Sequence, residues 1–96
     1  MHIGAARFSL YLPETFSLKE KRGIVKSAVE RARKRFNAAI AQVDDLDDMR
    51  IGTIGVVVVS NDAHHADTML RTILEFVERD VLDAEMHEIE TEVFIW

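Results

Sequence analysis

The residues best suited to chemistry in this chain are basic, and they gather in one segment. Residues 17–36 hold eight Lys and Arg against two Glu, a net charge of +6 within a chain whose formal charge is −5. Rows of such side chains bind phosphates without reading a base sequence. On a helix, four of them fall within an arc of about 60°, namely Lys19, Arg22, Lys26 and Arg33. We predict that this row contacts RNA or a ribosomal subunit; the alternative is the solvated side of an amphipathic helix.

Other chemistries find little support in the residue types. The chain has no cysteine, which excludes disulfides and thiolate metal sites. His64 and His65 are adjacent, so on a helix their side chains diverge by about 100° and do not share one ion. The acidic run 44–48 lacks the glycine and distal glutamate of a calcium loop and is typical of a solvated turn. No serine has the setting of a nucleophile elbow. We therefore expect no catalytic residue, no metal and no cofactor.

Length and composition predict a single globular domain over residues 1–96. Hydrophobic residues make up 48% of the chain and charged residues 30%, an ordinary globular mixture. The longest aliphatic run, residues 54–59, is far shorter than the roughly 20 residues of a spanning helix. The N-terminus lacks the layout of a signal peptide. These features favour a cytoplasmic protein that makes no contact with a membrane.

Two amphipathic helices are expected, and the basic row lies on the first. Ser17 is a suitable N-cap, and Glu20 completes a capping box. Apolar residues then recur at helical spacing as far as Phe36. The second helix should begin near residues 60–62, where Ser, Asn and Asp are good N-caps. Its apolar stripe comprises Ala66, Met69, Leu70, Ile73, Leu74 and Val77.

Four segments have the alternation or the β-branched composition of strands. They are residues 2–12, 37–43, 50–60 and 85–96. The third is apolar on both faces, which favours a central place in the sheet. In the fourth, alternation predicts that His87 and Ile89 point inward.

The element order β-α-β-β-α-β predicts a ferredoxin-like α+β fold. Two helices would cover one face of a four-stranded antiparallel sheet, and the other face would be open. Because crossover connections are right-handed, the first and third strands should be central.

The open face is the second candidate for function. If the helices pack on the side of Phe8 and Ile89, large apolar side chains remain uncovered. These are Tyr11, Val57, Phe94 and Trp96, together with half of the central valines. Such a patch usually marks an interface, and we predict a homodimer through it. In the alternative, Arg7 and the glutamates of the last strand keep the face hydrated, with Arg7 paired to one of them.

The chain also resembles the YlxP-like family, a bacterial family of unknown function. The resemblance is carried by Ser17-Leu18-Lys19-Glu20-Lys21-Arg22, Arg35-Phe36-Asn37, Val43-Asp44 and Gly55-Val56-Val57-Val58-Val59-Ser60-Asn61-Asp62. It covers nearly the whole chain and implies a ferredoxin-like fold. It also implies a genomic setting beside factors of transcription elongation, translation initiation and ribosome maturation. No catalytic residues are established for the family, so the resemblance implies none here.

Two functions therefore stand side by side. One is a non-catalytic RNA- or ribosome-associated factor that uses the basic row. The other is a protein-interaction or homo-oligomeric scaffold module that uses the open sheet face. A small-molecule regulatory domain has only the fold in its favour.

Overall fold

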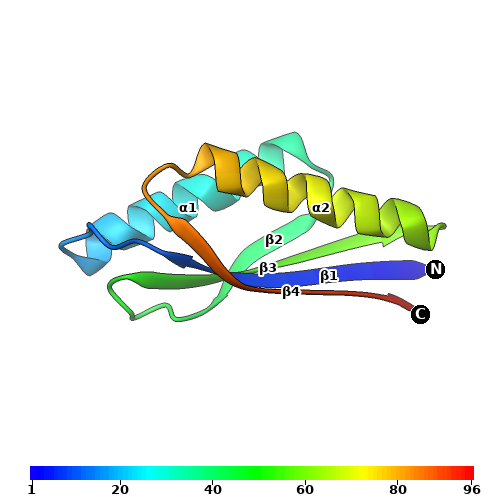
Figure 1. Cartoon of the computed structure of the whole chain (residues 1–96), viewed down its shortest axis with the longest axis horizontal. Helices are drawn as coiled ribbons and strands as arrows, with labels where there is room; N and C mark the ends of the chain where they lie inside the picture. Colours follow the sequence, from blue (N-terminus) through cyan, green and yellow to red (C-terminus); the bar gives the residue numbers. More distant parts are fainter.

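The computed structural model describes all 96 residues, and its elements follow the predicted order. They are β1 (His2–Tyr11), α1 (Leu18–Arg35), β2 (Ala39–Asp44), β3 (Ile51–Ser60), α2 (Ala63–Asp80) and β4 (Glu85–Ile95). The strands form one antiparallel sheet in the order β2-β3-β1-β4. Both helices lie on the same side of it (Figure 1). The ferredoxin-like prediction is confirmed, with β1 and β3 at the centre.

Each helix begins at a side chain that accepts a hydrogen bond from a free backbone N–H of the first turn. The Ser17 hydroxyl accepts from Glu20 N at 3.1 Å, and the Asp62 carboxylate accepts from His65 N at 3.0 Å. The Glu20 carboxylate accepts from Phe16 N at 3.5 Å. The predicted capping box is therefore present in a form that reaches one residue further back than expected.

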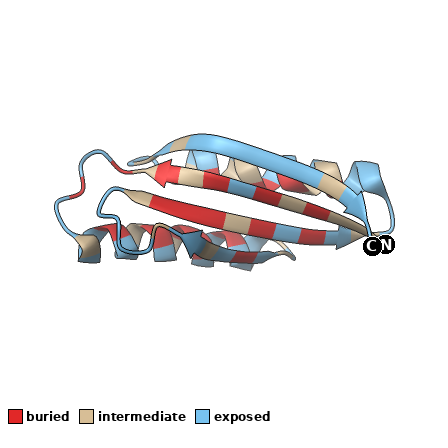
Figure 2. Cartoon of the chain, turned by 90° about the horizontal axis from the view of Figure 1, so that it is seen from below, coloured by how far each residue is buried: buried red, intermediate tan, exposed pale blue.

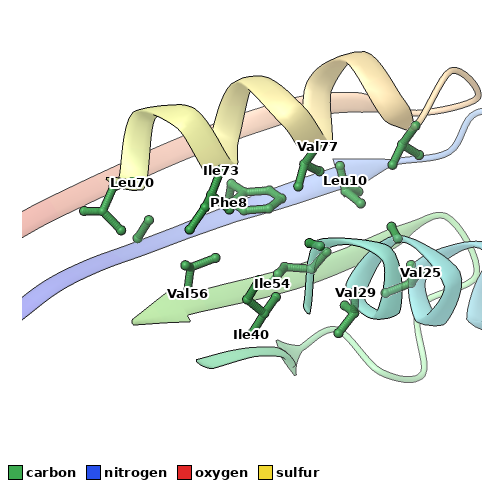
Figure 3. Close-up of a cluster of buried hydrophobic side chains, with 14 of the residues drawn as sticks. Phe8, Leu10, Val25, Val29, Ile40, Ile54, Val56, Leu70, Ile73 and Val77 are labelled. Carbon is green, nitrogen blue, oxygen red and sulfur yellow. The ribbon is translucent and has the colours of Figure 1, made fainter. Parts of the chain in front are cut away.

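The core lies between the two helices and the inner face of the sheet (Figure 3). On that face α2 lies over β1, and α1 lies toward β2 and β3. The residues that meet there are almost fully buried, and they include Phe8, Leu10, Val25, Val29, Ile40, Ile54, Val56, Leu70, Ile73 and Val77. The apolar stripes predicted for the two helices are therefore the faces that they bury.

Close approach of α2 to the sheet depends on a glycine in β1. A Cβ at Gly4 would lie 2.9 Å from a methyl group of Val58 and 3.1 Å from one of Leu70. Contacts that short do not occur between carbon atoms without displacement of one of them. Gly4 thus lets Leu70 pack directly against the sheet.

The last strand departs from the alternation that the sequence predicts. Its register with β1 shifts between Arg7 and Ser9, where Glu88 has a positive φ of 53°. The extra residue of such a β-bulge interrupts the alternation, so the side chains on one side of the bulge point to the opposite face of the sheet from the one predicted. Val93 still faces inward, opposite Gly4, but His87 pairs with Ser9 and its side chain is half exposed on the open side. The prediction that His87 points inward is wrong for this reason.

The core assignment predicts a rank order of stabilities. Leu70→Ala should lower the free energy of unfolding by about 2–5 kcal/mol, because it removes a buried side chain and leaves a cavity. Ser17→Ala should lower it by about 1 kcal/mol, through loss of the helix cap. Chemical denaturation of the two variants measures both values. The reverse order would contradict the packing described here.

Candidate binding surfaces

Figure 2 looks onto the face of the sheet that no helix covers. The side chains on this face divide it into an apolar half and a polar half. Directly paired residues of neighbouring strands point to the same face, so the register defines rows across it. From the end that holds the two termini, the rows are Val59–Ile3–Phe94, Ala39–Val57–Ala5–Glu92, Ala41–Gly55–Arg7–Glu90 and Thr53–Ser9–His87. The first two rows carry one charged residue between them, and the next two are largely polar.

Large apolar side chains are exposed in the apolar half. Val57 is 45% exposed, Val59 59% and Phe94 40%. Trp96 follows β4 at the same end, where its backbone N donates to the carbonyl oxygen of Met1 at 2.8 Å. Three of the four predicted interface residues therefore lie toward one end of the sheet.

Tyr11, the fourth predicted interface residue, lies at the opposite end of β1. It pairs with Ile51 and Glu85. Its ring meets that of His87 edge to face, with 6.2 Å between the centroids. Tyr11 thus belongs to the polar half and not to the apolar patch.

Beside β2 the apolar half deepens into a hollow of about 600 Å³. Its lining is mostly small, with Ala5, Ala39, Ala41 and Gly55 among the open-face residues. Gly55 makes room for Val43, because a Cβ at position 55 would lie 3.0 Å from a methyl group of Val43 and would displace that side chain by a few tenths of an ångström. The only charged residue in the lining is Arg33, which lies near the start of β2.

The polar half is held together by contacts between side chains. A terminal nitrogen of Arg7 lies 3.1 Å from each carboxylate oxygen of Glu90, as predicted for a residue facing outward beside a glutamate. The Thr53 hydroxyl donates to the Asp45 carboxylate at 2.6 Å and lies 3.3 Å from the hydroxyl of Ser9. These contacts join β1, β3, β4 and the β2–β3 loop on this face.

Arg22 and Arg33 of the predicted basic row lie on the side of α1 that faces the free edge of β2 and the β2–β3 loop, whereas Lys19 borders the hollow between α1 and the α2–β4 connection. All four residues are exposed, but two of them are engaged within the chain. Arg22 forms an ion pair with Asp47 at 3.1 Å, and Arg33 donates from Nε to the carbonyl oxygen of Ile40 at 2.7 Å. Lys19 and Lys26 form no ion pair. Exposed pairs such as Arg22–Asp47 contribute little stability, so Arg22 remains available for exchange with another anion.

Lys21 is the residue that sequence reasoning missed. It is fully buried, and its Nζ donates to the carbonyl oxygens of Asp45 at 2.7 Å and Leu46 at 3.3 Å. Desolvation lowers the pKa of the Lys21 ammonium from its usual value, while the nearby Asp48 carboxylate opposes that shift. The helical spacing in the sequence could have predicted this burial, because position 21 extends the buried stripe of Val25, Ala28 and Ala32 by one turn.

The side chains are not arranged for metal binding, and neither helix is of a membrane-spanning kind. No three or more of the His, Asp and Glu residues are placed to hold a metal ion. Neither helix is both long enough and apolar enough to cross a bilayer. His64 and His65 lie in the first turn of α2 and are exposed.

Comparison with known proteins agrees with this architecture. A family model described as "Protein of unknown function (DUF503)" matches residues 3–91. The "Uncharacterized protein YlxP" of Bacillus subtilis (strain 168) is 28% identical over 76 residues, which are 79% of this chain and 83% of that protein. The chain is also similar to the solution NMR structure of a de novo designed protein with a ferredoxin fold. That likeness has a TM-score of 0.55 at 17% identity, covers 96% of this chain and 87% of the other, and supports the fold alone.

The burial of Lys21 predicts a difference between two lysines of one helix. Lys21→Ala should lower the free energy of unfolding by about 2–4 kcal/mol, because it removes a packed side chain and leaves two carbonyl oxygens without their donor. Lys26→Ala, at an exposed position of α1, should change it by less than about 0.5 kcal/mol. Urea denaturation of the pair measures both. Equal effects would contradict a structural role for Lys21.

Proposed function

The chain belongs to the DUF503 family of proteins of unknown function, in keeping with its YlxP-like sequence. We propose that it is a non-catalytic interaction module that associates with itself through the open sheet face. One observation carries the proposal: Val57, Val59 and Phe94 are exposed on neighbouring rows of an uncovered sheet. Contact between such a patch and water is unfavourable, and patches of this kind usually mark interfaces.

A second copy of the chain suits this face for a structural reason. Both helices already pack on the inner face, so no element of the chain is left to cover the outer one. Two sheets that meet face to face bury both patches at once. Closed two-fold dimers are the commonest oligomers, and an uncovered sheet face can meet its own copy across such an axis.

The second candidate function is binding of RNA or a ribosomal subunit through the basic row of α1. It is favoured by the exposure of Lys19 and Lys26, which have no ionic partner within the chain. Arg22 and Arg33 lie on the same side of the helix. Arg22 would bind a phosphate in place of Asp47, and Arg33 would bind one through its terminal nitrogens while its Nε stays bonded to Ile40. Phosphate contacts of this kind position a protein on RNA without selecting a sequence.

The self-association proposal predicts a dimer mass in light scattering at micromolar concentration. Val57→Glu should shift the mass to that of a monomer, because it places a charge at the centre of the buried patch. Leu82→Glu is the matched control: Leu82 is also an exposed apolar residue, but it lies in the α2–β4 connection and its change should leave the dimer intact. A wild-type chain with a monomer mass would reject the proposal, as would a dimer indifferent to both Val57→Glu and Trp96→Ala.

The polyanion proposal predicts binding of a short single-stranded RNA that weakens steeply with salt. With four phosphate contacts, the slope of log affinity against log salt should be roughly −3 to −4. Changing Lys19, Arg22, Lys26 and Arg33 to Gln should remove most of the binding and leave the helix content unchanged by circular dichroism. Arg71→Gln with Arg79→Gln on α2 matches Lys19→Gln with Lys26→Gln in net charge and should have little effect. No binding by the wild type at low salt, or equal loss in both variants, would contradict a specific role for α1.

A further inference from the structure

The two free edges of the sheet carry complementary side chains at the ends of one row. At the β2 end of the row, Ala39 borders the alanine-lined hollow, with Arg33 beside it. At the β4 end of the same row stands Glu92, and the neighbouring row ends in Phe94. One edge therefore offers an apolar space with a cation, and the other offers an aromatic ring with an anion.

Both charged groups have bonding capacity that the chain does not use. Arg33 donates from Nε to Ile40, but its two terminal nitrogens make no hydrogen bond within the chain. Glu92 forms no ion pair, whereas Glu90, two residues earlier, is paired with Arg7. A free guanidinium and a free carboxylate thus lie on opposite edges of one sheet, too far apart to meet within a single copy.

The pattern of the rows selects one arrangement of two facing sheets. A two-fold axis that crosses the strands at the middle of the sheet would lay the apolar half of one copy on Ser9, Thr53 and His87 of the other. Moved into the apolar half, such an axis would face β4 with β4 and set the glutamates of the two copies against one another. An axis parallel to the strands lays apolar half on apolar half. Because that axis reverses the order β2-β3-β1-β4 from side to side, it also brings β4 of one copy over β2 of the other.

We infer that the hollow beside β2 is the docking site for Glu92 of a second copy, related by a two-fold axis parallel to the strands. This inference rests on the proposed self-association of the open face. Such an axis keeps each row opposite itself, so it lays Glu92 over Ala39 and puts Phe94, one row nearer the termini, at the rim of the hollow. The Glu92 carboxylate accepts hydrogen bonds from the terminal nitrogens of Arg33, and its methylene groups cover the small side chains. Symmetry forms the contact twice, so each dimer holds two filled hollows and two ion pairs.

Pairing through the strand edges is the competing arrangement, and both edges oppose it. The carbonyl oxygen of Ile40 in β2 is occupied by Arg33. The β4 edge carries several glutamates, so two β4 strands side by side would repel one another. Charged side chains of this kind are the usual protection of a sheet edge against added strands. In the face-to-face arrangement, the Glu92 carboxylate of one copy is instead attracted to the Arg33 guanidinium of the other.

A charge-reversal cycle tests the docking site. Dimer dissociation constants of the wild type, Arg33→Glu, Glu92→Arg and the double variant are measured by analytical ultracentrifugation. Each single reversal should weaken the dimer about tenfold or more, and the double variant should recover most of that loss because the pair is restored with opposite polarity. Circular dichroism checks that Arg33→Glu, which also loses its bond to Ile40, still folds.

A size change tests the hollow without altering charge. Ala39→Trp should dissociate the dimer, because the indole occupies the space that the Glu92 side chain of the other copy needs. Thr72→Trp, on the exposed side of α2, should leave it intact. A wild-type dimer with no recovery in the charge-reversal cycle, or one that tolerates Ala39→Trp, would overturn the docking site and leave self-association standing. A monomeric wild type would overturn both.

Discussion

Right-handed crossovers place both helices of this chain on the same face of its sheet, and most other features of the molecule follow from that constraint. The inner face receives the apolar stripes of both helices, so the core is built from alternate residues of β1 and β3. The outer face receives nothing from the chain. Its polar half is stabilised by contacts such as Arg7–Glu90, whereas its apolar half is covered by no element of the chain. The proposed interface is the part of the sheet that the fold itself leaves without a partner.

At the far end of the sheet, the buried ammonium group of Lys21 fixes the β2–β3 loop to α1 by hydrogen bonds, where apolar packing holds the elements together elsewhere. Lys21 binds two carbonyl oxygens of the β2–β3 loop, and these bonds offset the desolvation of its charge. The same loop presents Asp45 to Thr53 on the opposite side of the sheet. Within the six-residue stretch that resembles the YlxP-like family, Ser17 and Glu20 form the helix cap, and Arg22 pairs with the loop. Folding thus accounts for much of that motif, and a polyanion contact depends most on Lys19 and Lys26.

The two proposed functions meet at Arg33. In the dimer its guanidinium binds a carboxylate of the other copy, and in the polyanion contact it binds a phosphate. The two uses exclude one another at this side chain. Lys19 and Arg22 lie at the other end of α1, away from the docking hollow, and Arg22 pairs there with the β2–β3 loop. A dimer therefore keeps part of the basic row accessible on each copy. Self-association is compatible with a polyanion site that lacks Arg33.

The order of elements, both N-caps, the inward stripes and the central valine strand were all predictable from the sequence, because each depends on periodicity or on side chains within one turn of a helix. The outward pairing of Arg7 was predictable for the same reason. The facing of His87 was not, since a bulge at Glu88 interrupts an alternation that looks regular in the sequence. The bonds of Lys21 to the β2–β3 loop, the separation of Tyr11 from Phe94 and the hollow beside Arg33 depend on loops and on register between distant strands. Such features arise only when segments far apart in the chain pack together, and local patterns carry no information about the distances between them.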